Sequence, residues 1–531
     1  MAIRELTSEQ AEGSESSLTM PPSGLPSANP TSSYWLSEPS PILLGHRTTE
    51  ELPVETDVVV VGSGITGVFA TLFLLEKNRL GGTIKGESLE KVVLLEAREV
   101  CSGATGRNGG HCQPLVYGSA PAVAAFELEV FKFMESLVKE ENIPCDWVSL
   151  TGVHAFYSEN MFELAAASVD QLQQTHPELA AQMEVVRPSS SSNQGDTLAS
   201  LRVPTAKGAI VQKKAASLWP YKLVTQIVER LLAKYPPPTF NLQTNTPVTQ
   251  LTRHESGNRW VAITPRGSIT ARHVLLATNG YTSHLLPAFA DLIVPVRGQV
   301  GALLPPRPKV DAGEGSPAKL NHSYVFAADP EIETGATAPR DDYLVQRPMP
   351  TGELIYGGGR RFARSLGVGE WRDDELEPQV AEYLRKSLAP VLDLTPSSAN
   401  SDEKTPTREL NASFEWTGVM GYSRDQHAWV GPVPESMGGG EGLWICAGYT
   451  GHGMPAAALS AREVVRQILT TNGAEIEGDA KDGVKLPREF MVSEKRIIEA
   501  RTLPPLAQGW EATNFATLIT STGLLDQRKA S

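Results

Sequence analysis

The feature that most constrains this chain is a run of β-branched residues that ends in closely spaced glycines. Residues 57–67 read DVVVVGSGITG. This pattern predicts a buried parallel strand that leads through a tight turn into a helix over residues 65–77. Gly62, Gly64 and Gly67 have the spacing at which glycine permits the turn, the approach of a pyrophosphate and close packing of helix on strand. We therefore predict a dinucleotide site, with the positive end of the helix facing the phosphates.

A second buried strand supports this interpretation. Residues 91–97 read KVVLLEA, and Glu96 stands at the end of the strand, where a carboxylate can accept hydrogen bonds from ribose hydroxyls. Glu96 lies further from Gly67 than the roughly 20 residues that are usual, and a polar insert over residues 78–90 accounts for the difference. The alternative is an ordinary strand–turn–helix unit with a surface glutamate.

Nucleotide-binding pieces recur along the chain. Residues 271–281 and 442–455 again read as a buried strand that runs into glycine, whereas residues 259–271 and 342–359 alternate polar and apolar side chains as antiparallel strands do. We predict an α/β fold (α+β overall) with a Rossmann-like dinucleotide-binding domain built from separated segments. A mainly antiparallel β-sheet substrate domain with helices is inserted between them.

The expected segments follow from these patterns. They are a disordered tail at 1–33; the three parts of the nucleotide-binding domain at 34–115, 205–290 and 416–475; a helical segment of the substrate domain at 116–204; the substrate domain proper at 291–415; and a C-terminal extension at 476–531. The tail is rich in Ser, Pro, Glu and Thr, a composition that buries too little apolar area to offset the entropy of ordering.

Length and charge exclude several functions. A chain of 531 residues is long enough for two to four domains, and its net charge of −14 argues against a nucleic-acid partner held by phosphate contacts. No apolar run of membrane-spanning length and no secretory leader are expected, and the four cysteines lack metal-site spacing, so no metal is predicted. We expect a cytoplasmic protein with reduced thiols and no membrane partner.

A glycine-dense loop indicates which dinucleotide binds. Residues 101–111 read CSGATGRNGGH and come directly after the ribose-binding strand. Backbone without side chains can lie flat against a large planar ring, which a flavin has and which nicotinamide enzymes do not require.

With this loop, the sequence resembles the FAD-dependent amine and amino-acid oxidase superfamily, which includes D-amino-acid oxidase, glycine oxidase and sarcosine oxidase. In its motifs it is most similar to the γ-glutamylputrescine oxidase type, through the GATGRNGG segment at 103–110. The resemblance runs with gaps from about residue 34 to 500. It includes Tyr34-Trp35 and the segments ATNGY at 277–281, PVRGQ at 295–299, GGGR at 357–360 and AGYTGHGM at 447–454.

The resemblance implies that the nucleotide-binding domain is of the FAD-binding, glutathione-reductase type. It also implies that FAD is the cofactor and assigns residues to it. Those expected to hold the ADP half are Gly62, Gly64, Ile65, Thr66, Gly67, Glu96, Ala97 and Arg98, with the backbone of Val248 at the adenine. Those expected to line the flavin ring and ribityl chain are Ala104, Thr105, Arg107, Asn108, Gly109 and Gly110. Those expected at the start of the last helix, with its dipole facing the flavin N1–C2=O edge, are Gly448, Gly451, His452, Gly453 and Met454.

Two departures from the superfamily bear on chemistry. Sarcosine oxidases tether the flavin through a cysteine at the position that corresponds to about Met420 here, so this chain lacks that link. FAD is therefore expected to be unlinked, with His111 or Cys112 as the alternative attachment points. Glycine and D-amino-acid oxidases have a carboxylate-binding arginine in the same stretch, whereas Arg424 here is displaced by several residues. This favours a substrate amine that lacks an α-carboxylate.

The candidate catalytic residues are His111, Tyr422, Arg424 and Tyr449. The expected reaction is hydride transfer from a primary or secondary amine to flavin N5, giving an imine and then an aldehyde or ketone, with molecular oxygen reduced to hydrogen peroxide. No lysine occurs in the strand comparable to the one that carries the oxygen-activating lysine of sarcosine oxidases, so a dehydrogenase that uses another acceptor stays open.

Two further hypotheses remain at this point. One is an amino-acid oxidase or dehydrogenase that holds the substrate carboxylate with Arg424, Arg360 or Arg297. The other is a flavin-binding protein without turnover, which would contain a flavin that no amine reduces.

Overall fold

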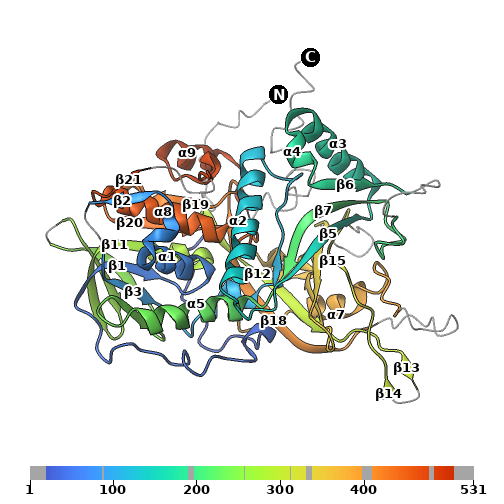
Figure 1. The fold of residues 1–531 in the computed structure, drawn as a ribbon, viewed down its shortest axis with the longest axis horizontal. Helices are drawn as coiled ribbons and strands as arrows, with labels where there is room; N and C mark the ends of the chain where they lie inside the picture. The colour runs from blue at the N-terminus through green and yellow to red at the C-terminus, as the bar shows by residue number, and fades with distance from the viewer. Residues whose placement is uncertain are drawn as a thin grey trace, which may run out of the picture.

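Two large sheets form the two halves of the molecule (Figure 1). In this computed structural model the described residues are 20–86, 89–188, 197–255, 257–310, 313–330, 338–396, 409–477 and 483–506.

The first sheet is largely parallel, in the order β19-β20-β11-β1-β3-β8, with β10 and β9 continuing from β11 as an antiparallel extension. Its strands are β1 (Glu55–Val61), β3 (Val92–Leu95), β8 (Phe240–Gln243), β9 (Gln250–Arg253), β10 (Trp260–Thr264), β11 (Gly267–Leu276), β19 (Trp429–Pro432) and β20 (Leu443–Ala447). The central strand β1 pairs with β3 on one side and β11 on the other. It is therefore covered on both edges, and its valines fill both faces, which explains the continuous β-branched run.

Helices α1 (Ile65–Leu75), α5 (Pro220–Lys234) and α8 (Ala457–Thr471) pack together beside this sheet (Figure 1). Residues 65–74 of α1 are all buried, because the helix lies between the sheet and both other helices. An apolar surface all round a helix is the expected result of such a position.

The second sheet is mainly antiparallel, in the order β18-β12-β17-β16-β15-β5-β7-β4, with β6 beside β7. Its strands are β4 (His111–Cys112), β5 (Val148–Phe156), β6 (Met183–Val186), β7 (Gly208–Ser217), β12 (Ile293–Leu303), β15 (His322–Ala328), β16 (Arg340–Gln346), β17 (Leu354–Gly358) and β18 (Ala412–Ser423). Helices α3 (Glu159–Thr175), α4 (Pro177–Ala180) and α7 (Pro378–Ser387) belong to this half, and α2 (Pro121–Glu140) stands between the two halves (Figure 1).

The remaining elements are short. They are β2 (Thr83–Lys85) paired with β21 (Glu475–Glu477), the hairpin of β13 (Lys309–Val310) and β14 (Gly313–Glu314), α6 (Thr282–Leu285), and α9 (Glu494–Thr502) near the end of the described chain.

The predicted fold class is confirmed, with a parallel nucleotide-binding sheet assembled from separated segments and an inserted antiparallel sheet. Strand pairing differs from the expected segment boundaries at three strands. β4, β7 and β18 lie in the antiparallel sheet, although the ranges 34–115, 205–290 and 416–475 assign all or most of each to the nucleotide-binding domain. The sequence at these positions predicts apolar strands, but nothing in it indicates which strand each one pairs with.

The expected disordered tail is wrong for residues 20–33. These residues lie against the body of the protein, with Ser23 and Ser33 buried, while residues 1–19 lie outside the described part. The segment forms no helix or strand, and polar contacts to the body hold it instead of a core of its own. From their low-complexity sequence, residues 189–196 and 396–407 are expected to form surface loops, and the first and most of the second fall outside the described residues.

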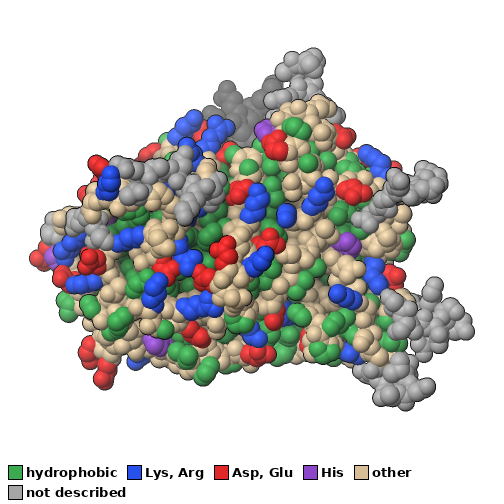
Figure 2. All heavy atoms as spheres, in the orientation of Figure 1, with side chains coloured by type: hydrophobic (Ala, Val, Ile, Leu, Met, Phe, Trp, Pro, Cys, Tyr) green, Lys and Arg blue, Asp and Glu red, His purple; other side chains and the backbone are tan. Residues whose placement is uncertain are grey.

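Acidic and basic side chains are interspersed over the face seen in Figure 2, with no block of one sign. In the described part of the chain, no helix combines the length and the apolar character that a membrane span requires.

Candidate cofactor and active site

A single cavity of about 500 Å³ extends from the glycine turn after β1 to the antiparallel sheet. Gly62, Gly64 and Glu96 line it from the parallel half, and Gln299 and Tyr343 line it from the antiparallel half. A ligand in this cavity would therefore contact both sheets at once.

The turn after β1 requires glycine at two positions. Gly62 has φ of 103°, and a Cβ there would lie 2.8 Å from the carbonyl oxygen of Ala277. A Cβ on Gly67 would lie 1.8 Å from the carbonyl oxygen of Gly62, so only glycine lets α1 start against the strand. The N-cap residue Gly64 has no side chain, so it does not itself cap the first N–H groups of α1. This is the arrangement that binds phosphate at a helix N-terminus.

Glu96 lies at the edge of the cavity and is buried. Its Oε2 accepts hydrogen bonds from the backbone N–H of Ser63 (2.9 Å) and from its hydroxyl (2.6 Å), and its Oε1 accepts from the N–H of Arg98 (2.9 Å). These contacts fix the carboxylate beside the glycine turn, where ribose hydroxyls can donate to its remaining lone pairs.

The glycine-dense loop packs tightly between the two sheets. Its 3₁₀ turn (Ala104–Arg107) brings the Thr105 hydroxyl to accept a hydrogen bond from the N–H of Ile65 at 3.0 Å. A Cβ on Gly109 would lie 2.0 Å from the ring of Tyr343, so glycine is needed for that ring to pack on the loop. The indole of Trp35 donates to the carbonyl of Asn108 at 2.6 Å, which anchors the loop from its other side.

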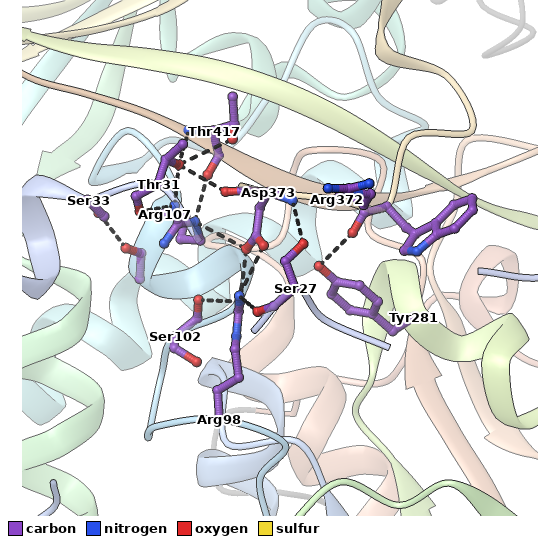
Figure 3. A network of polar contacts seen from close by, with 12 residues as sticks. Ser27, Thr31, Ser33, Arg98, Ser102, Arg107, Tyr281, Arg372, Asp373 and Thr417 are labelled. Carbon is purple, nitrogen blue, oxygen red and sulfur yellow. Dashed lines mark hydrogen bonds and ion pairs between the residues drawn. The ribbon is translucent and has the colours of Figure 1, made fainter. Parts of the chain in front are cut away.

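Arg98 and Arg107 both reach one buried carboxylate, that of Asp373 (Figure 3). Arg98 donates to both carboxylate oxygens, at 3.0 and 2.9 Å, and Nε of Arg107 lies 3.4 Å from Oδ2. Burial lowers the pKa of Arg107 to about 10, and the charge of Asp373 opposes this shift. Arg107 therefore stays protonated at neutral pH.

The loop before α8 contributes a histidine that is paired with a buried carboxylate. His452 Nε2 lies 3.2 Å from Oε2 of Glu127, a buried residue of α2. Burial lowers the pKa of His452, but the charge of Glu127 and the hydrogen bond between them outweigh it, and the pKa is raised from its usual value.

Two other histidines on the cavity wall are neutral. Burial lowers the pKa of His111 to about 3, with repulsion from His452 adding to the effect, and its Nε2 lies 2.9 Å from the hydroxyl of Ser323. Burial likewise lowers the pKa of His154 to about 3.

The tautomer of His154 follows from its neighbours. The side-chain carbonyl of Gln212 accepts from the N–H of Val116 at 3.0 Å, which turns the Gln212 amide nitrogen toward His154 Nε2 at 3.2 Å. Nε2 is therefore an acceptor, and Nδ1 carries the proton that faces the hydroxyl of Tyr117 at 2.5 Å.

The end of the cavity on the antiparallel sheet contains an ion pair. Arg360 contacts Asp341 and also donates to the hydroxyl of Tyr422 at 3.2 Å, and all three residues line the cavity beside Tyr343. The Arg360–Asp341 pair has no net charge, and it presents both a carboxylate and a guanidinium to a polar ligand.

Most of the predicted residues line this one cavity. They are Gly62, Gly64, Ile65, Thr66, Glu96, Ala97, Arg98, Ala104, Thr105, Arg107, Asn108, Gly109, His111, Val248, Tyr422, Tyr449, Gly451, His452, Gly453 and Met454. Gly67, Gly110 and Gly448 are not among the residues that line the cavity. Gly110 and Gly448 have positive φ. The hydroxyl of Tyr449 points to Thr66 (3.0 Å) and Cys446 (3.1 Å), which makes it a link between α1 and β20.

The structure places the catalytic candidate Arg424 away from the cavity. Its guanidinium donates to the carbonyls of Arg501 and Leu503 at the end of α9 and to Asp291, and it does not line the cavity. Arg297 is paired with Glu377 and also lies outside the cavity wall. Of the three arginines considered for a substrate carboxylate, Arg360 alone faces the cavity in the described structure.

Several wall residues were not predicted. His154, Asp341, Leu25 and Pro26 line the cavity, and Glu127 and Asp373 hold residues that do. They lie far apart in sequence and in no motif, so no sequence signal marks them. Cys112, named as an attachment point, is fully buried and is not on the wall.

The residues fit FAD. A turn whose glycines leave no room for a Cβ, a helix N-terminus with glycine as its N-cap residue and a fixed carboxylate meet at one end, and the glycine-dense loop lies further along the same cavity. Fold and site together define a protein of the dinucleotide-binding class, with its cavity between two sheets.

The comparisons with known proteins identify the family. Residues 57–467 match the model of the FAD dependent oxidoreductase family, DAO, and the chain belongs to this family of FAD-dependent oxidoreductases. A probable oxidoreductase OrdL of Rhizobium meliloti (strain 1021) is 23% identical over 458 residues, which cover 84% of this chain and 88% of the relative.

Two solved structures show the same fold. Glycine oxidase from Geobacillus kaustophilus superposes with a TM-score of 0.57 at 17% identity, covering 82% of this chain and 99% of its own. L-amino acid deaminase from Proteus vulgaris, with its specific insertion sequence deleted, gives a TM-score of 0.57 at 15% identity, covering 83% and 96%.

Proposed function

We propose that this protein oxidises the C–N bond of a primary or secondary amine to an imine, which hydrolyses to an aldehyde or ketone. The observation that carries the proposal is the single cavity that joins the dinucleotide-type turn to a polar pocket on the antiparallel sheet. Bound FAD supplies the two-electron acceptor at its N5 position, and reoxidation by molecular oxygen would give hydrogen peroxide. Unlinked FAD is supported by the burial of Cys112 and by the engagement of His111 Nε2 with Ser323.

The protein's own contribution is to orient the amine and exclude water. The carboxylate of Asp341 attracts a cationic amine, which releases a proton to solvent before its nitrogen lone pair can form the imine, and the rings of Tyr343 and Tyr422 confine it. His111 is a hydrogen-bonding group rather than a base, because a pKa of about 3 makes it a weak proton acceptor at neutral pH. His452 lines the cavity and is held in place by the buried Glu127 carboxylate.

A second candidate function is oxidation of an amino acid, and Arg360 favours it. Arg360 is the one arginine on the antiparallel half of the described cavity wall, and its guanidinium can hold a carboxylate if it exchanges Asp341 for the substrate. In that case Asp341 is released to accept the substrate ammonium group.

Anaerobic mixing with separate panels of amines and amino acids tests both candidates through bleaching of the flavin absorbance. We expect bleaching by an amine without a carboxylate, and a KM raised about tenfold or more by Asp341→Asn, with Arg360→Met causing a smaller change. Bleaching by amino acids alone, with the larger KM effect on Arg360→Met, would establish the second candidate. A yellow protein that neither panel bleaches would contradict both.

The identity of the electron acceptor is tested separately. No lysine is among the described residues of the cavity wall, so the oxygen-activating lysine of sarcosine oxidases has no equivalent there. Comparing the rate of peroxide formation in air with the rate of reduction of an artificial acceptor distinguishes an oxidase from a dehydrogenase.

A further inference from the structure

Residues 20–33, which we name the N-terminal strap, form part of the cavity wall. Leu25 and Pro26 line the cavity, although the strap has no helix or strand and its composition favours disorder. Contacts with the body must therefore hold these two residues in place.

One set of contacts precedes Leu25. The N–H of Ser23 donates to the hydroxyl of Ser283 at 2.9 Å, and the two hydroxyl oxygens lie 3.2 Å apart. Gly24 packs against the indole of Trp371 so closely that a Cβ would lie 2.3 Å from its Nε1. Both serines are buried. The strap is thus fixed before it reaches the cavity.

A second set of contacts follows Pro26 (Figure 3). Arg98 donates to the carbonyl of Ser27 at 3.0 Å, and the N–H of Asp373 lies 3.2 Å from the Ser27 hydroxyl. The N–H of Thr31 donates to the carbonyl of Asp373 at 2.8 Å, and Arg107 donates to the Thr31 hydroxyl at 2.6 Å. Leu25 and Pro26 therefore bridge two anchored points.

Asp373 is the centre of the second anchor. It is 1% exposed, it pairs with both arginines, and its backbone contacts the strap at two points. Removing one partner of a buried charge cluster leaves uncompensated charge, which is strongly destabilising. Arg98 and Arg107 themselves line the cavity, so the cluster couples the strap to the wall of the cofactor site.

We propose that the strap is a component of the FAD site, in which Leu25 and Pro26 cover the bound cofactor and Asp373 is the positioning residue that locks the strap to Arg98 and Arg107. FAD then enters or leaves only when the strap detaches, and the strap sets the residence time of the cofactor. The proposal requires FAD in the cavity and does not depend on the substrate.

An engineered disulfide that can be reduced, here called the staple, tests this proposal on the full-length holoprotein. The double variant Ser23→Cys/Ser283→Cys places two thiols where the hydroxyl oxygens are 3.2 Å apart, and the four native cysteines are buried. Release of FAD after dilution is followed by the recovery of flavin fluorescence. We expect release to be about tenfold slower or more in the oxidised form and to match the wild type after reduction, so that the reduced protein is its own control. Equal rates in both forms, with the disulfide verified by thiol titration, would overturn the proposal.

Deletions provide the opposite perturbation. Removing residues 2–27 should speed FAD release about tenfold or more, whereas removing residues 2–19 should leave it within about twofold. Asp373→Asn should also speed release, and circular dichroism checks that each variant is folded. Equal release rates for the two deletions would contradict the proposal. If the longer deletion or Asp373→Asn fails to fold, the comparison of the oxidised and reduced disulfide variant tests the proposal instead.

If no amine bleaches the flavin, the proposed function is contradicted, but the FAD release rates still test the role of the strap.

Discussion

His154 is held as a neutral imidazole, and this determines how stability responds to acid. Its folded pKa is about 3, below the ordinary value of 6.5, so between these values the unfolded chain binds one proton more than the folded protein. Stability from this residue is therefore fully present above pH 6.5 and is lost as the pH falls toward 3. At pH 5 the loss amounts to about 2 kcal/mol.

The variant His154→Gln removes this titration. We expect it to be less stable than the wild type at pH 7, since it disrupts the contacts with Tyr117 and Gln212, but to lose less stability between pH 6.5 and 4.5. Urea unfolding at several pH values measures the slope, with His254→Gln at an exposed position as the control. Parallel slopes for His154→Gln and the wild type would show that His154 titrates normally in the folded protein.

Single residues were predictable where local chain geometry fixes their role. Gly62 and Gly64 follow a strand and open a helix within a few residues, so their spacing alone predicts the turn. Arg424 was misplaced because its partners at the end of α9 lie more than seventy residues away and no pattern links them. His154 was missed for the same reason, since the side chains that contact its ring come from two other segments, Gln113 and Tyr117 in one and Gln212 in the other.

At the scale of elements, the position of Arg424 in the structure gives it a testable role in stabilising the end of α9. It caps α9 by donating to the carbonyls of Arg501 and Leu503 at the C-terminal end of the helix, where carbonyls lack partners within the helix. We expect Arg424→Met to lower the free energy of unfolding by about 1–3 kcal/mol and to leave the rate of flavin reduction unchanged. Chemical denaturation and stopped-flow reduction measure the two effects.

The matched control for this element is Arg488→Met, because the Arg488 side chain is 91% exposed and pairs only with its neighbour Glu489 among the contacts of the described residues. It should change neither quantity. If Arg424→Met slowed flavin reduction without loss of stability, Arg424 would belong to the active site after all.

The strands themselves were easier to predict from sequence than the strands with which they pair. The valine run of β1 and the alternation of β10 carry their own periodicity. Strand β18 pairs with β12 over a separation of more than a hundred residues, and nothing in either strand specifies that register. The segment boundaries shifted at β4, β7 and β18 because these strands join a sheet formed by residues distant in sequence.

At the scale of the whole molecule, the cavity is where the two sheets meet. The wall combines residues that follow β1 and β3 with residues of β12, β16 and β18, and the N-terminal strap contacts both halves. A ligand that binds only the folded protein and touches both halves stabilises them together.

We therefore expect FAD to raise the midpoint temperature of a single unfolding transition. At a free concentration of 100 times Kd, binding contributes about 2.7 kcal/mol, which corresponds to a shift of a few degrees in a large protein. Differential scanning calorimetry of the apoprotein at increasing FAD concentration measures the shift. FMN at the same concentrations is the control, because it lacks the AMP half that the glycine turn and Glu96 are placed to bind. Equal shifts with FMN and FAD would mean that this turn contributes no binding energy. A midpoint that FAD does not move would mean that the cavity between the sheets is not the cofactor site.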